Sequence, residues 1–155
     1  MSENPQLRIH RTPDGDPLDP WMYGLLKFVG CYNVLAGLGM IVLYHEGFKM
    51  LGLAKPDMNL PIQLVGMMVA LFGVGYWIVA RNPIENRNVL LLGFWSKFLG
   101  SVLAAPYVIS GQLPMIMIPI VLLADVIYLV PFWRIYQRCR AAAELRQRTH
   151  YSNAA

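Results

Sequence analysis

Three ionisable side chains lie well inside long apolar segments of the sequence, at Lys27, Lys97 and Asp125. A charged group deep in a bilayer is costly, so it is rarely left unpaired or facing lipid. Lys97 comes nine residues after Asn88, and Asp125 comes nine residues before Arg134. At the helical rise, both would lie roughly 13 Å from the same end of two adjacent antiparallel helices. The sequence therefore predicts an ion pair between Lys97 and Asp125 in the apolar interior.

Other polar side chains are placed to join this pair. Lys27 follows Trp21 by six residues, a depth of roughly 9 Å, and its long stem can reach either the pair or the membrane surface. Turned inward, it would give two cations against one anion, and a carboxylate, a phenolate or a quinone oxygen would find a donor. We expect the polar centre to contain Lys97, Asp125, Lys27, Asn33, Tyr76 and Tyr128.

Two roles fit such a centre. As a structural clamp, the ion pair would fix the register of two helices, and a partner that is already present reduces the need for any other explanation. As a site, it would support proton-coupled transport or bind an anion, a quinone or a lipid, since intramembrane charges are often functional. The residues alone favour the clamp slightly and leave both roles open.

The composition indicates what kind of elements hold these residues. Of 155 residues, 56% are hydrophobic and 14% are charged, and the mean hydropathy is +0.43. A soluble domain usually has about a quarter charged residues. This balance excludes a disordered chain and a disulfide scaffold, and it indicates an integral membrane protein.

The apolar residues fall into four windows, each long enough to cross a hydrocarbon layer of roughly 30 Å as a helix. We predict an all-α four-helix bundle in residues 21–136, after a polar arm (1–20) that shows no signal peptide and before a basic tail (137–155). The first connection, residues 45–60, suits a short interfacial helix. The predicted spans are about 21–44, 61–80, 88–109 and 115–136.

Positive charge is distributed unequally between the two sides of this bundle. With four spans, both termini and the second loop share one side, which holds nine arginines. The opposite side holds only Lys49 and Lys55. The positive-inside rule then places both termini in the cytoplasm of a bacterial inner membrane. The formal charge of 13 − 9 = +4 suits anionic lipid, and we expect no nucleic-acid partner because no recognised nucleic-acid-binding fold accompanies the arginines.

Small and polar residues recur at helical spacing on three of the predicted spans. Such residues let membrane helices approach closely and form hydrogen bonds between them. We therefore expect these faces to pack inside the bundle. They comprise Lys27, Gly30, Asn33 and Gly37; Gln63, Gly66, Ala70, Gly73 and Trp77; and Ser96, Gly100 and Ala104.

The sequence gives little support for catalysis or a bound metal. His10, His45 and His150 lie outside the spans or at their edges, which argues against haem held between helices. Cys31 and Cys139 belong to no C-x-x-C motif, so thiol redox chemistry is not expected. We find no catalytic residues, metal site or identifiable cofactor, although a quinone is compatible with the polar centre. One acid and one or two lysines make an enzyme the weakest interpretation.

Several short fragments carry a resemblance to a known group of proteins. Over residues 21–136, the chain resembles small bacterial four-span membrane proteins that are broadly DoxX-like and mostly of unknown function. The resemblance implies an association with quinone-linked or oxidoreductase partners. Its fragments are Tyr23-Gly24 with Lys27, Phe48 with Leu51-Gly52, Gly73-Val74-Gly75-Tyr76 with Ala80-Arg81-Asn82-Pro83, Gly93 with Lys97 and Gly100, Gly111-Gln112-Leu113-Pro114, and Asp125 with Pro131-Phe132.

Two functions of different classes follow. The first is an accessory or structural subunit of an inner-membrane complex, docked to a larger membrane protein or to further copies of itself through its polar arm and basic tail. The second is a small transporter or a quinone- or lipid-binding protein that uses the intramembrane lysine and aspartate. Co-purifying partners would discriminate between them.

Overall fold

The computed structural model describes residues 17–154 of the chain, and its regular elements in that range are all helical. Four helices are long and apolar enough to cross a membrane, which confirms the predicted number of spans. In chain order the elements are α1 (Pro20–Val42), α2 (Tyr44–Met50), α3 (Leu60–Arg81), α4 (Arg87–Ile109), α5 (Met117–Val121), the π-helical turn η2 (Leu122–Val126) and α6 (Ile127–Ala154). The predicted arm, residues 1–20, lies almost entirely outside the described residues.

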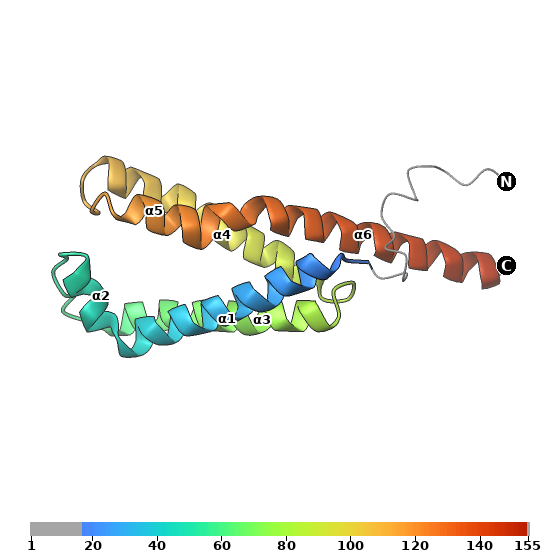
Figure 1. The fold of residues 1–155 in the computed structure, drawn as a ribbon, viewed down its shortest axis with the longest axis horizontal. Helices are drawn as coiled ribbons and strands as arrows, with labels where there is room; N and C mark the ends of the chain where they lie inside the picture. The colour runs from blue at the N-terminus through green and yellow to red at the C-terminus, as the bar shows by residue number, and fades with distance from the viewer. Residues whose placement is uncertain (1–16, 155) are drawn as a thin grey trace.

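Helices α1 and α3 form one tight antiparallel hairpin, connected through the short helix α2 (Figure 1). Glycines let their backbones touch. A Cβ atom on Gly66 would lie 2.7 Å from the carbonyl oxygen of Gly37, and one on Gly73 would lie 2.6 Å from that of Gly30. Both approaches are too close for any side chain. The glycines of the small faces predicted for the first two spans, Gly30, Gly37, Gly66 and Gly73, therefore pack as expected.

The second hairpin pairs α4 with a fourth span that is less regular than predicted. Instead of one helix over 115–136, the chain forms α5, then the π-helical turn η2, then α6. Pro119 lies in α5 and Pro131 lies in α6, on either side of the turn. Each proline removes a backbone donor from the helix. Helix α6 also continues beyond the fourth span to Ala154, through most of the basic tail (137–155).

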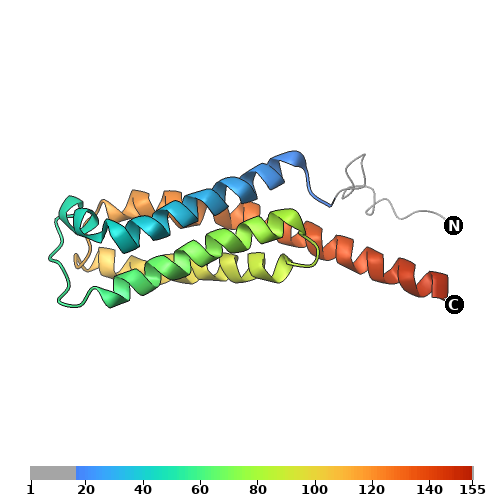
Figure 2. The same ribbon diagram turned by 90° about the horizontal axis from the view of Figure 1, so that it is seen from below.

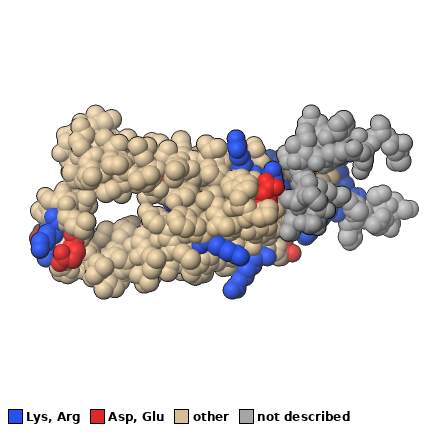
Figure 3. Space-filling view, in the orientation of Figure 1, with Lys and Arg blue, Asp and Glu red and all other residues tan. Residues whose placement is uncertain are grey.

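The two hairpins meet mainly at the end of the molecule that carries the α3–α4 turn. The buried core lies there and draws on every span, with Leu26 from α1, Tyr76 from α3, Leu90 from α4 and Phe132 from α6. Towards the α2 end the hairpins diverge (Figure 1). The space-filling view shows an opening between them (Figure 3). The bundle is therefore closed at one end and split at the other.

The surface has the character expected of a membrane protein. Large apolar side chains are exposed on all the long helices, including Leu35, Leu64, Leu103 and Val130. The charged side chains visible in Figure 3 cluster towards the two ends, with an uncharged band between them. Only 11–28% of the most apolar window of each span is buried within the protein. The exposed apolar band is therefore suited to contact with lipid.

Candidate polar centre inside the membrane

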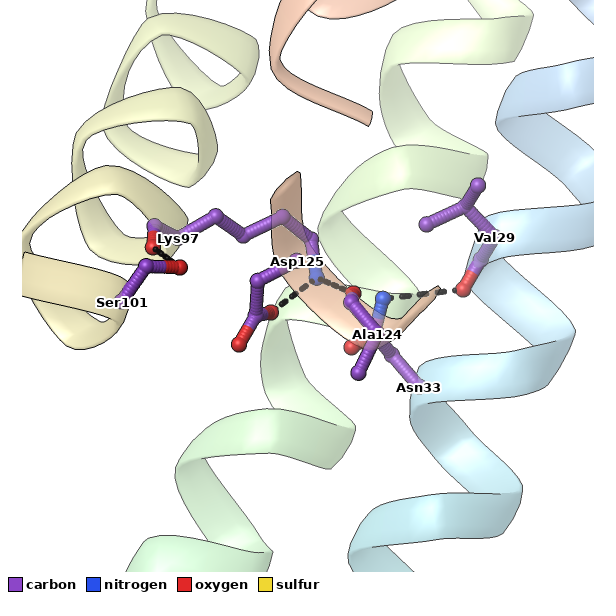
Figure 4. Close-up of polar contacts among 6 residues, drawn as sticks. All are labelled: Val29, Asn33, Lys97, Ser101, Ala124 and Asp125. Carbon is purple, nitrogen blue, oxygen red and sulfur yellow. Dashed lines mark hydrogen bonds and ion pairs between the residues drawn. The ribbon is translucent and has the colours of Figure 1, made fainter. Parts of the chain in front are cut away.

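Lys97 and Asp125 form the ion pair that their spacing predicts. Lys97 Nζ lies 2.8 Å from Asp125 Oδ1, joining α4 to the turn η2 (Figure 4). The Lys97 side chain is 7% exposed and that of Asp125 is 31% exposed. The cation is therefore enclosed by protein, whereas the carboxylate can still be approached from outside.

The π-helical turn supplies a second acceptor for the same ammonium group. Lys97 Nζ donates a hydrogen bond of 2.7 Å to the backbone carbonyl oxygen of Ala124, the residue before Asp125. One turn further along α4, Ser101 Oγ donates to the carbonyl oxygen of Lys97 at 2.8 Å. π-Helical turns within α-helices often occur at functional sites. Here the turn presents a carbonyl and a carboxylate to one cation.

Both members of the pair keep hydrogen-bonding capacity. A lysine ammonium has three donors, and Lys97 directs them to two acceptors, Ala124 and Asp125. Within residues 17–154, the second carboxylate oxygen of Asp125 accepts no hydrogen bond from the protein. The centre can thus donate one hydrogen bond and accept another without breaking its ion pair.

The tyrosines predicted at the centre lie beside it. The Lys97 ammonium sits 5.4 Å from the centroid of the Tyr128 ring, within the range of a cation–π contact. Tyr76 is 1% exposed, and its ring contacts Phe132 edge-on with centroids 5.0 Å apart. Tyr128 in turn lies against the same Phe132 ring, with centroids 6.1 Å apart.

Asn33 is buried, as expected of a polar residue inside a bundle, but it bonds within its own helix. Its Nδ2 donates to the carbonyl oxygen of Val29 at 3.0 Å. Figure 4 shows this bond within α1. Among the described residues, Asn33 forms no hydrogen bond with the ion pair.

Lys27 does not join the centre, so that part of the prediction is wrong. Its side chain is exposed and lines a separate groove with Trp77 and Arg81. The reason is the direction of the lysine on its helix, because the buried residues Leu26 and Asn33 lie about 100–120° around α1 from Lys27. A lysine near the end of a span can extend to the surface, which costs less than burial.

The prediction that a small-residue face of the third span packs inside the bundle is also wrong in part. Ser96 and Gly100 are exposed, and a Cβ atom on Gly100 would meet nothing within 4 Å. Only Ala104 lies against another element, in a groove between α4 and the fourth span. Helix α4 therefore turns Lys97 inward and its neighbours Ser96 and Gly100 outward.

That groove, which we name the α4–α5 groove, is a feature that the sequence did not reveal. It has a volume of about 250 Å³, and its walls are almost wholly apolar. Its inner end lies one helical turn from the ion pair, at Ser101 on α4 and at Leu122 and Val126 around Asp125. It extends past Ala104 to Val108 and Ile118. The groove is thus apolar along its length and ends about one helical turn short of the polar centre.

The described residues contain no cluster of three or more His, Cys, Asp or Glu that could hold a metal ion. No family model matches the chain, and searches of curated proteins and of solved structures found no match. Function must therefore be argued from the polar centre itself.

Proposed function

We propose that this chain is a membrane protein that binds a quinone, with the head group at the Lys97–Asp125 pair and the apolar tail in the α4–α5 groove. The observation that supports this function most is the proximity of the two. The apolar groove ends about one helical turn from a partly exposed carboxylate and a buried ammonium. Ligand sites typically combine apolar walls with a few placed polar groups.

The head-group chemistry follows from the free hydrogen-bonding capacity of the centre. The remaining Lys97 donor would bond to a quinone carbonyl oxygen. Asp125 Oδ2 would accept a hydrogen bond from the hydroxyl of the reduced form, a quinol. A pure structural clamp needs neither group to be approachable, yet Asp125 keeps 31% of its side chain exposed.

The α4–α5 groove would hold the apolar tail of the quinone. From Ser101 to Ile109 it follows α4 for about 12 Å, and the lining alanines, Ala104 and Ala105, leave room beside the helix. Pro106, in the same stretch of α4, has no backbone donor. An isoprenoid tail would be shielded on one side by protein and on the other by lipid.

A binding isotherm with a short-chain benzoquinone, measured on the chain in lipid nanodiscs, tests this function. Asp125→Asn should weaken binding about tenfold, as expected for the loss of a charged hydrogen-bond acceptor. Ala104→Leu, which fills the groove and leaves the ion pair intact, should also weaken it. Val102→Leu on the exposed face of α4 is the matched control. The proposal fails if wild type does not bind, or if Ala104→Leu and Val102→Leu give the same isotherm.

A second function, an accessory subunit of an inner-membrane complex, is favoured by a different observation. Helix α6 continues well beyond the other three spans (Figures 1 and 2). Its projecting part carries Arg140 and Glu144, which form an i,i+4 ion pair at 3.0 Å, along with Arg146 and Arg148. A projecting charged helix suits docking to a partner, and a stoichiometric partner retained in mild detergent would support this function.

The proposed location is a bacterial inner membrane with both chain ends in the cytoplasm. The support is the charge of the end where α6 projects, which carries Arg81, Arg87, Arg134 and Arg138 among the described residues. The opposite end carries Lys49 and Lys55. This asymmetry follows the positive-inside rule. The DoxX-like resemblance, with its quinone-linked partners, is compatible with the same location.

A further inference from the structure

A second groove, distinct from the polar centre, lies between α1 and α3 near the α3–α4 turn. We name it the α1–α3 groove. Its volume is about 320 Å³, and it is lined by Lys27, Cys31, Trp77, Ala80 and Arg81. Two of these five residues are cations, and none is acidic. We propose that this groove binds the phosphate group of an anionic phospholipid.

The floor of the groove is built by close packing of the two helices. The indole Nε1 of Trp77 donates to the carbonyl oxygen of Lys27 at 3.1 Å. This contact depends on Gly30, because a Cβ atom there would lie 2.5 Å from Trp77 Cδ1. The indole therefore lies across the backbone of α1. The small side chains of Cys31 and Ala80 leave space beside it.

The described residues supply no acidic partner for the positive charge of the groove. Within residues 17–154, neither Lys27 nor Arg81 forms an ion pair. The acidic residues nearest to this end in the chain are already engaged. Asp19 pairs with Arg138 at 2.6 Å, and Glu85 accepts a hydrogen bond from Asn82 at 2.6 Å. In the part of the chain that the structure describes, the two cations facing this groove thus lack an anionic partner.

The depth of the groove fits a lipid head group. Arg81 is the last residue of α3, and Lys27 is the eighth residue of α1. At the helical rise, Lys27 lies about 10 Å from the start of its helix. Tryptophan is enriched at this level of a membrane. A phosphodiester at the interface would reach both cations, while its acyl chains follow the exposed apolar side chains of Phe28 and Ile78.

The test is lipid retention by the full chain in mild detergent, counted by native mass spectrometry with phosphatidylglycerol or phosphatidylcholine added. We expect one phosphatidylglycerol to be retained. The double variant Lys27→Gln/Arg81→Gln should lower the affinity about tenfold or more, since each cation near a membrane surface contributes roughly 1 kcal/mol. Both side chains are exposed and unpaired within the described residues, so the variant should fold.

Lys49→Gln/Lys55→Gln, which removes the same charge from the opposite end, is the control and should retain the lipid like wild type. Three results would overturn the proposal: equal retention by the Lys27→Gln/Arg81→Gln variant, an equal loss in the control, or equal retention of phosphatidylcholine. Displacement by millimolar inorganic phosphate would also overturn it, because the groove would then be a site for free phosphate. Quinone binding at the polar centre is measured separately, and none of these outcomes depends on it.

Discussion

Gly66 of α3 lies against Gly37 of α1 so closely that a methyl group on Gly66 would come within 2.7 Å of the Gly37 carbonyl oxygen. The partner atom belongs to the backbone and cannot move aside without separating the helices. Membrane helices gain much of their association energy from such close packing. The contact therefore stabilises the hairpin of α1 and α3, against which the second hairpin packs.

Gly66→Ala should lower the free energy of unfolding in detergent by about 1–3 kcal/mol, the usual cost of overpacking. Gly100→Ala is the matched control, since a methyl group there meets nothing within 4 Å. Removing a helical glycine at an open position should raise stability by about 0.5–1 kcal/mol. Denaturant titration of both variants measures the difference, and equal effects of the two substitutions would show that α1 and α3 are not in contact at Gly66.

Asp125→Ala should be strongly destabilising, because it leaves the Lys97 ammonium buried without its carboxylate. Breaking a buried ion pair by removing one partner costs about 3–5 kcal/mol. The double variant Lys97→Met/Asp125→Leu removes both charges and should recover most of this loss. Thermal unfolding in detergent gives the comparison. A single variant as stable as wild type would mean that Lys97 is not enclosed as described.

The ion pair between Asp19 and Arg138, at 2.6 Å, joins the start of α1 to α6. Both side chains are partly exposed, at 28% and 25%, so the expected coupling is about 1 kcal/mol. A double-mutant cycle with Asp19→Asn and Arg138→Gln measures it. The coupling should decrease at high salt, and a coupling of zero at low salt would contradict the contact.

The proposed orientation predicts a difference in access between two exposed loop residues. Asp57 lies between α2 and α3, and Glu85 lies in the α3–α4 turn. In a Cys31→Ala background, Asp57→Cys should react with a membrane-impermeant thiol reagent in intact bacterial cells. Glu85→Cys should react only after the cells are opened. The reverse pattern would place both chain ends outside.

Long-range features that depend only on hydropathy and helical rise could be predicted from the sequence. The number of residues between apolar and charged positions predicts three features. These are the four spans, the Lys97–Asp125 contact and the short helix after the first span. The small faces of the first hairpin, at Gly37 and Gly66, follow from helical periodicity. These predictions need no knowledge of how the two hairpins meet.

Which face of each helix points into the bundle could not be predicted in the same way. Lys27 and Gly100 were placed in the interior, yet both are exposed. In an apolar span nearly every face is hydrophobic, so periodicity barely distinguishes lipid from protein. The turn η2 lies between Pro119 in α5 and Pro131 in α6, and the α4–α5 groove lies between α4 and the fourth span. Hydropathy and helical rise predict neither feature.

The most direct test of the polar centre is an infrared difference spectrum of the chain in nanodiscs, recorded with and without a short-chain benzoquinone. Asp125 is the carboxylate closest to the proposed head group, so its ionised-carboxylate band should shift when the quinone binds, and Asp125→Asn should abolish that shift. A difference spectrum without a carboxylate shift, or one that Asp125→Asn leaves unchanged, would contradict quinone binding at this centre.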